Sequence, residues 1–320
     1  MSIKILVTYH DQHPILRSDI LMPIQTGAAV APLLFDGMLR DDDGENISNR
    51  NDKFSELSAM YWAWKNYDKI GNPDYIGFMH YRRQFVFDER LALPYPKWIS
   101  SFYFVSSLNI AKAYFSDESI KKTIQEYDYL IPKYHVTPTK NIREEYDKHI
   151  PGSHVEIFDT FIQICREIIP DWEEEICQIE TGNIVSVCNM FVMKKQLFFD
   201  YCDFAFPILF ELEKRINADN YTENGKRFLG YMAEKLQAMY TFRLEKNPDL
   251  KEKFLNCVYV RPDVQRSDIR VQNPVWKNVS KWMYFRYKLL AKITWGKRQM
   301  HYKQKCREAK AALKNRKERR

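Results

Sequence analysis

The residues best suited to chemistry in this 320-residue chain are His80-Tyr81-Arg82-Arg83, which end an apolar, strand-like run. Ligands of open α/β sheets bind beyond the carboxyl ends of such strands. Two neighbouring guanidinium groups on a rigid strand end suit planar, bidentate binding of phosphate or carboxylate oxygens. The alternative is a surface strand end with solvated charges, in which His80 is a structural residue.

A second segment, residues 46–66, precedes this cluster and is dense in polar side chains and tryptophan. The two segments belong to a pattern of four blocks that occur in order over about residues 1–245. The blocks are Asn51 with Glu56-Leu57 and Tyr61-Trp62-x-Trp64-Lys65-Asn66; Tyr75-Ile-Gly-x-x-His80-Tyr81-Arg82-Arg83; Asn189-Met-Phe-Val-Met-Lys-Lys195; and Arg227-Phe-Leu-Gly230-Tyr-Met-Ala-Glu234. The pattern resembles a bacterial family catalogued as a domain of unknown function and associated with capsule and O-antigen gene clusters, whose members are regarded as glycosyltransferases.

The resemblance implies a GT-A-like, Rossmann-like α/β fold that transfers sugar from a nucleotide diphosphate, with UDP expected and galactose or galactofuranose as the sugar. The acceptor it implies is lipid-linked or an oligosaccharide, in the synthesis of capsular polysaccharide, exopolysaccharide or lipopolysaccharide. Such enzymes usually hold a metal on an Asp-x-Asp motif at a strand end. His80-Tyr81-Arg82-Arg83 stands there instead, which argues against ordinary dependence on Mn²⁺ or Mg²⁺. The segment Asp41-Asp42-Asp43 has no apolar strand ahead of it, and turn chemistry explains it.

On this hypothesis Arg82 and Arg83 act in catalysis, since they place positive charge where the leaving diphosphate gathers negative charge. The alternative holds one arginine, Arg83 rather than Arg82, in an ion pair with Glu56 or Asp88. His80 and Asn51 are further candidates for donor binding. At the end of the first strand, Thr8, Tyr9 and His10 are expected to contact the nucleotide base, although a loop packed on the sheet explains them almost as well.

The acceptor side is expected on a later helix, where Arg227, Gly230 and Glu234 share one face because they are three and four residues apart. Glu234 is our candidate for the general base that takes the proton of the acceptor hydroxyl. Asn189, Arg227 and His149 are the candidate acceptor contacts. A structural ion pair of Glu234 with Arg227, and a loop histidine without a catalytic role at 149, are the competing interpretations.

The elements that must position these side chains alternate between strand and helix. Strand patterns cover residues 4–10, 74–79 and 128–132 and the long β-rich run 184–193, while helical spacing covers residues 54–67, 156–169, 196–216 and 225–244. This alternation is typical of an α/β sheet with helices on both faces. We expect residues 1–265 to form the transferase domain.

Residues 266–320 are expected to form a separate basic, amphipathic extension. From Lys277 onward the chain carries 16 Lys and Arg against two acids, a net charge of +14, so the remainder carries −7. Apolar residues recur at helical spacing from Trp276, which predicts that residues 276–320 bind an anionic membrane surface. The competing class is a nonenzymatic scaffold or nucleic-acid-binding protein acting through this tail, but no nucleic-acid partner is expected for the acidic body.

Six cysteines without paired or zinc-type spacing indicate reduced, mostly buried thiols and therefore a cytoplasmic protein. The chain has no signal-peptide pattern and no run of 18 apolar residues. We therefore expect a peripheral protein on the inner face of the plasma membrane. The sequence identifies no cofactor.

Overall fold

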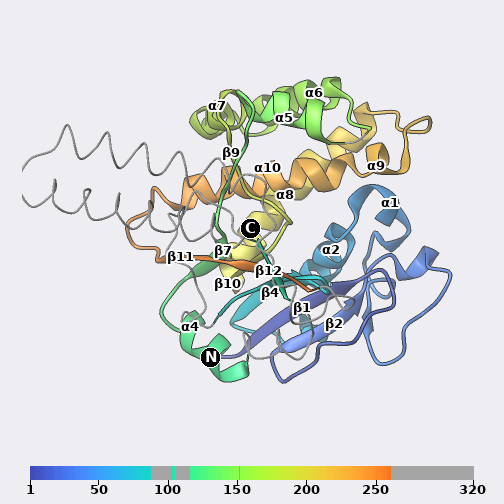
Figure 1. Cartoon of the computed structure of the whole chain (residues 1–320), viewed down its shortest axis with the longest axis vertical. Coiled ribbons are helices and arrows are strands. Elements are labelled where there is room, and N and C mark those ends of the chain that lie inside the picture. The colour runs from blue at the N-terminus through green and yellow to red at the C-terminus, as the bar shows by residue number, and fades with distance from the viewer. Residues whose placement is uncertain (88–101, 106–115, 151, 261–320) are drawn as a thin grey trace, which may run out of the picture. The chain divides into compact units, whose positions relative to one another are not determined.

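The computed structural model describes residues 1–87, 102–105, 116–150 and 152–260. Its centre is one large mixed sheet whose main path runs β11-β7-β10-β4-β1-β2-β3 (Figure 1). The strands of this path are β1 (Ile3–Tyr9), β2 (Leu21–Gln25), β3 (Leu39–Arg40), β4 (Tyr75–His80), β7 (Tyr129–Pro132), β10 (Phe191–Lys194) and β11 (Glu252–Leu255). Because β1, β2, β3 and β4 are parallel, their carboxyl ends meet at one edge of the sheet. The antiparallel strand β10 pairs with both β4 and β7 and joins the two halves.

Three further strands extend the sheet beside β4. They are β5 (Arg83–Phe85), β6 (Phe102–Val105) and β12 (Cys257–Val260), with β12 lying between β5 and β6. A separate small ribbon pairs β8 (His135–Val136) with β9 (Ile184–Val185). These additions surround the carboxyl end of β4 with chain from distant parts of the sequence.

Helices cover the sheet on both faces, as the sequence pattern predicts. The α-helices are α1 (Asn51–Phe54), α2 (Leu57–Lys65), α4 (Asp117–Ile124), α5 (Ile142–His149), α6 (Val155–Ile168), α7 (Glu173–Thr181), α8 (Lys195–Arg215), α9 (Glu223–Lys226) and α10 (Phe228–Leu244). Short 3-10 turns are η1 (Ala28–Val30), η2 (Ser48–Arg50), η3 (Tyr67–Ile70) and η5 (Pro170–Trp172). In Figure 1, α8 and α10 lie over one side of the sheet with α5, α6 and α7 beyond them, while α4 lies on the other side.

Alternation of side chains in β1 explains why both faces are covered. Leu6 packs into a core cluster with α2, α8 and α10, whereas Ile5 and Val7 pack into the second cluster, with Ile120 and Ile124 of α4. Successive strand residues point to opposite faces, so a strand that is apolar throughout needs a layer on each side. Helix α10 has buried residues on all sides, including Lys235 and Gln237, because it lies between neighbouring helices.

The predicted α/β fold is therefore confirmed, with two corrections to the elements. The predicted helix 225–244 is divided at Arg227 into α9 and α10. The β-rich run 184–193 is not one strand, because a turn at Cys188 and Asn189 separates β9 from β10. The predicted boundary at 265/266 and the basic segment 276–320 lie outside the described residues. Cysteines 165, 177, 188, 202 and 257 carry free thiols. No helix in the described part of the chain is long and apolar enough to cross a membrane.

Candidate active site at the carboxyl ends of the parallel strands

The His80-Tyr81-Arg82-Arg83 cluster forms a tight hairpin between β4 and β5. His80 pairs with Arg83 across the two antiparallel strands, so Tyr81 and Arg82 occupy the turn. Arg82 is exposed at this turn, whereas Arg83 is half-buried and pairs through its backbone with β12. The sequence interpretation placed both arginines on one strand end. The structure instead puts Arg82 at the tip of the turn and Arg83 on the returning strand.

Aromatic rings pack around this hairpin. The ring of Tyr81 stacks on Tyr9 at a centroid distance of 5.5 Å, and it contacts His13 at 4.3 Å and His10 at 5.4 Å. Tyr9 is fully buried, and its hydroxyl accepts a hydrogen bond from the N–H of Leu16 at 2.8 Å. Burial raises the pKa of Tyr9 to about 12. Its hydroxyl therefore holds the loop after β1, while His10 is exposed and His13 is partly exposed at this strand end.

His80 ties the hairpin to two other segments. Its Nε2 lies 2.6 Å from the carbonyl oxygen of Cys188, and its Nδ1 lies 3.2 Å from Oγ1 of Thr8. Burial lowers the pKa of His80, and the charges of Arg83 and Arg82 add to this against the opposing effect of Glu56. A neutral ring fits both contacts when Nε2 donates to the carbonyl and Nδ1 accepts from the threonine hydroxyl.

Cys188 and Asn189 form a strained turn at the centre of the cluster. Their φ angles are 75° and 45°, in the left-handed region of backbone conformation that residues other than glycine rarely adopt. Such a conformation costs about 1–3 kcal/mol per residue and persists only where surrounding contacts fix it. Here His80 binds the Cys188 carbonyl, and Oε1 of Glu234 accepts the Cys188 N–H at 2.6 Å.

The side chain of Asn189 supplies the remaining contacts of this turn. Its Nδ2 donates to Oε1 of Glu56 at 2.8 Å and to the carbonyl oxygen of Gly230 at 3.0 Å. Its Oδ1 is buried and has no hydrogen-bond partner among the described residues. A buried acceptor without a partner is uncommon in folded proteins and suits a donor supplied by a ligand.

Arg227 lies at the junction between α9 and α10, where it is exposed. Its Nε donates to Oγ of Ser55 at 3.1 Å, and Ser55 is itself strained, with a φ of 50°. Asn51 fixes this strained residue, because its Nδ2 donates to the Ser55 carbonyl at 2.6 Å. Asn51 also packs so closely on Gly27 that a Cβ there would lie 2.6 Å from it. Asn51 is therefore placed as a support for the Ser55 turn.

The charged side chains of this cluster shift the pKa values of His10 and Tyr231. Partial desolvation lowers the pKa of His10, and the positive charges of Arg82 and Arg227 lower it further. Burial raises the pKa of Tyr231. The charge of Arg227 lowers this pKa, and the charge of Glu234 raises it. The Cys188 thiol lies within the electrostatic reach of Glu56 and Glu234 and of Arg82 and Arg83, so carboxylates and guanidinium groups gather around this turn.

One predicted acceptor residue lies apart from this cluster. His149 ends α5 and is exposed, and its Nδ1 lies 3.0 Å from Oε2 of Glu145 on the same helix. None of the hydrogen bonds found in the described residues joins it to the hairpin or to the Cys188 turn. His149 therefore belongs to the last turn of a helix and not to a loop, and its acceptor role stays a prediction. Conversely, Cys188 and Ser55 were missed, because no sequence signal marks a left-handed residue that is not glycine.

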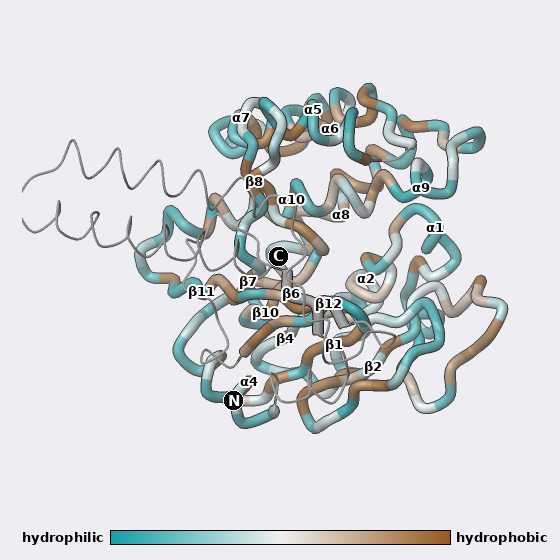
Figure 2. Tube along the Cα trace, in the orientation of Figure 1, coloured by the Kyte–Doolittle hydropathy of each residue, from teal (hydrophilic) through white to brown (hydrophobic). Residues whose placement is uncertain are grey.

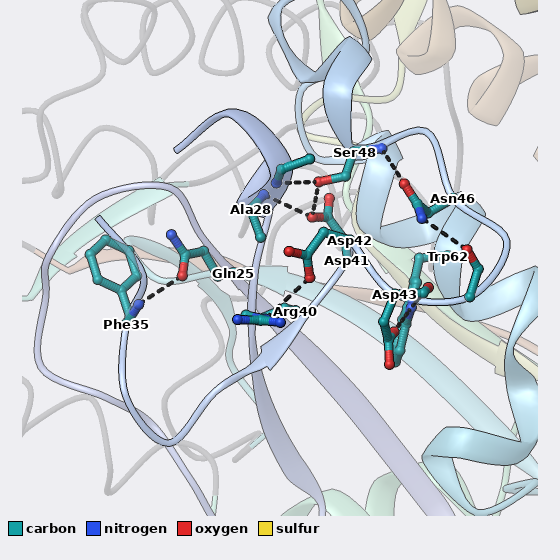
Figure 3. Close-up of polar contacts among 12 residues, drawn as sticks. Gln25, Ala28, Phe35, Arg40, Asp41, Asp42, Asp43, Asn46, Ser48 and Trp62 are labelled. Carbon is teal, nitrogen blue, oxygen red and sulfur yellow. Dashed lines mark hydrogen bonds and ion pairs between the residues drawn. The ribbon is translucent and has the colours of Figure 1, made fainter. Parts of the chain in front are cut away.

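The aspartate cluster Asp41-Asp42-Asp43 is engaged in structural contacts (Figure 3). Asp41 is fully buried and accepts the N–H groups of Gly27 at 2.9 Å and Ala28 at 3.0 Å. Asp42 pairs with Arg40 at 3.1 Å, and Asp43 accepts from the indole of Trp62 at 2.6 Å. The described residues contain no group of three His, Cys, Asp or Glu placed to hold a metal ion. The donor set of this part of the chain therefore does not fit the metal that GT-A enzymes commonly use.

The neutral state of His80 predicts a pH dependence of stability. The pKa of His80 is lower in the folded state than its ordinary value. Below about pH 6.5 the unfolded chain therefore binds a proton at this residue, whereas the native state does not. The stabilisation is complete above that pH and is lost as the pH falls through the folded pKa. We expect His80→Gln to shrink the difference in unfolding free energy between about pH 7.5 and about pH 5.5, measured by urea titration. His149→Gln is the matched control, and an unchanged difference in His80→Gln would contradict the assignment.

Fold and cluster together define a GT-A-like α/β protein in which histidine and arginine side chains gather at the carboxyl ends of β1 and β4. The chain belongs to the family described as "Domain of unknown function (DUF4422)", whose model matches residues 4–246. Among solved structures it is similar to the apo structure of WbbM, a bifunctional glycosyltransferase, with 31% identity and a TM-score of 0.72. The match covers 81% of this chain and 45% of WbbM, so the chain spans less than half of that protein. No curated protein sequence matches the chain.

Proposed function

We propose that this chain is a glycosyltransferase that transfers a sugar from a nucleotide diphosphate to an acceptor hydroxyl. The observation that carries the proposal is the meeting of the Arg82 hairpin with the strained Cys188–Asn189 turn at the carboxyl ends of parallel strands. Ligands of open α/β sheets bind at this edge. Similarity to WbbM, a glycosyltransferase, supplies independent support.

Each group has a role in the proposed reaction. The acceptor oxygen attacks the anomeric carbon, and the bond from that carbon to the diphosphate breaks, so the electron pair and the negative charge pass to the diphosphate. Arg82 and Arg83 lie where guanidinium groups neutralise that charge. Glu234 takes the proton of the acceptor hydroxyl, which corresponds to an inverting transfer. His80 is neutral and holds the Cys188 turn, so it adds no charge to the diphosphate.

The sugar-binding contacts follow from the unused polar groups. Asn189 Oδ1 accepts a hydrogen bond from a sugar hydroxyl, because it is buried and lacks a partner within the described part of the chain. Exposed Arg227 contacts the acceptor from the start of α10. His10 and Thr8 lie on the donor side at the end of β1. The described residues provide no fitting metal ligands, so we propose that charge neutralisation rests on the arginines.

The donor and the pathway rest on the family resemblance. We propose a UDP-sugar donor, with galactose or galactofuranose as the sugar. The acceptor is a lipid-linked or oligosaccharide chain of capsular polysaccharide, exopolysaccharide or lipopolysaccharide. A lipid-linked acceptor agrees with a cytoplasmic protein held at the inner membrane face by residues 276–320, where basic side chains are abundant.

A thermal-shift panel of UDP-, GDP- and dTDP-sugars tests this proposal on the full chain. A ligand that binds the native state raises the melting temperature, and we expect one UDP-sugar to raise it most. The shift and the turnover should persist after treatment with a chelator. Loss of activity that Mn²⁺ restores would refute the metal-independent reaction. A chain that binds no nucleotide sugar but binds RNA with steep salt dependence would instead be a tail-dependent scaffold.

A further inference from the structure

Large apolar side chains are exposed mainly on two neighbouring loops. Within the described residues, those with the highest exposure are Met1, Ile15, Val30, Leu33, Leu34 and Ile168, at 39–61%. Val30, Leu33 and Leu34 belong to the loop after β2, and Ile15 belongs to the loop after β1. Figure 2 shows the stretch after β2 as a hydrophobic segment at the margin of the molecule. Single exposed apolar residues are common, but a group on adjoining loops indicates an interaction surface.

The loop after β2, residues 28–35, has the sequence Ala-Ala-Val-Ala-Pro-Leu-Leu-Phe and contains no polar side chain. Hydrogen bonds from the buried side chain of Gln25 fix the backbone of this loop. The buried side chain of Gln25 donates to the Leu33 carbonyl at 2.7 Å and accepts from the Phe35 N–H at 2.8 Å (Figure 3). Phe35 packs against the same core cluster as Leu16, which follows Ile15. The two loops are therefore anchored together while Val30, Leu33 and Leu34 remain outside.

The first half of this loop has its backbone N–H groups bonded within the protein, whereas none of the hydrogen bonds of the described residues involves the N–H groups of Leu33 and Leu34. The N–H groups of Ala28 and Ala29 donate to Asp41 and Ser48, and those of Val30 and Ala31 donate to carbonyls one turn earlier. Pro32 has no N–H group. A segment that enters hydrocarbon must satisfy its backbone polar groups internally, since each unpaired group costs several kcal/mol. Water and lipid headgroups at the bilayer boundary can accept the N–H groups of Leu33 and Leu34, so this loop suits the boundary of a bilayer and not its centre.

We propose that residues 28–35, with Ile15 beside them, insert into the hydrocarbon boundary of an anionic lipid bilayer. The basic segment from Lys277 onward, with a net charge of +14, complements an anionic leaflet. Stable attachment to a membrane generally needs two signals, of which an apolar insertion and a polybasic segment are one combination. The Thr26 N–H bonds the Tyr9 carbonyl, so the apolar loop starts at the same sheet edge as the Arg82 hairpin. The candidate site therefore opens beside the bilayer.

Cosedimentation of the full chain with vesicles of phosphatidylcholine and phosphatidylglycerol tests this surface. At about 0.5 M salt the attraction of the basic segment is largely screened, so apolar insertion dominates the remaining binding. We expect the double variant Leu33→Ser/Leu34→Ser to lower the vesicle partition coefficient about tenfold or more. Val30→Ser should lower it less. Ile168→Ser, which changes an exposed apolar residue on α6, is the matched control and should bind like the parent chain.

Equal binding by Leu33→Ser/Leu34→Ser and Ile168→Ser would overturn the proposal. Sedimentation velocity without vesicles identifies the competing occupant, a second copy of the chain. If the parent chain is a dimer that the double variant dissociates, the loop is a protein interface and the lipid proposal is wrong. Circular dichroism of each variant verifies folding, which exposed positions are expected to preserve. Nucleotide-sugar binding in solution does not depend on this loop, so the two proposals fail independently.

Discussion

Replacing Arg82 by alanine is expected to lower kcat/KM for the nucleotide-sugar donor by about 10²–10³-fold. Arg82 is exposed at the hairpin turn and forms no ion pair with a described carboxylate; its guanidinium lies 5.5 Å from the Tyr81 ring centroid. Its charge is thus available to the leaving diphosphate, and its removal should leave the fold intact. Steady-state kinetics with the donor selected by thermal shift measure the loss.

Two further variants test whether the loss of activity comes from the charge of Arg82, from the planar shape of its guanidinium, or from removing any exposed arginine. Arg82→Lys keeps the charge but lacks the planar fork, so it should recover only part of the activity. Arg143→Ala removes another exposed arginine, which pairs with Asp159 on the surface of α5 and α6, and should retain parental kinetics. If Arg82→Ala and Arg83→Ala each keep full donor affinity and turnover, the diphosphate does not bind at this hairpin.

The arrangement of layers was predictable because it depends on periodicity. Apolar runs such as residues 4–10 fix a strand buried on both faces, and long helical repeats such as residues 196–216 fix α8. The end of the helix that carries Arg227 was less predictable. The predicted helix 225–244 is divided at Arg227 into α9 and α10, which leaves this residue free to reach Ser55. Such a break depends on tertiary contacts rather than on the spacing of apolar residues.

The candidate site was predictable only where strand ends mark it. His80, Thr8 and Arg82 lie at the carboxyl ends of parallel strands, and the structure brings them together as topology requires. The strained Cys188 turn was not predictable, because its left-handed backbone is stabilised by contacts with residues distant in sequence. His149 remains a prediction, because its ion pair with Glu145 on the same helix neither supports nor contradicts a contact with the acceptor.

Glu234→Gln is expected to lower kcat by about 10²–10⁴-fold while changing the KM for the donor little. Glutamine keeps an oxygen that can accept the Cys188 N–H, so the strained turn should survive, but it cannot take the acceptor proton. The carboxylate is well placed for this role because one oxygen is fixed at 2.6 Å from the Cys188 nitrogen while the side chain remains partly exposed, at 19%. Single-turnover kinetics distinguish slower chemistry from slower product release.

Glu56→Gln is the matched variant, because Glu56 is the other carboxylate that holds the turn, through Nδ2 of Asn189. If Glu234 is the base and Glu56 only positions Asn189, Glu56→Gln should change kcat much less. The reverse result would be a large loss of kcat in Glu56→Gln with near-parental kcat in Glu234→Gln. It would identify Glu56, which precedes α2, as the base and Glu234 as a positioning residue. Equal melting temperatures of the two variants would show that the difference lies in proton transfer and not in the stability of the turn.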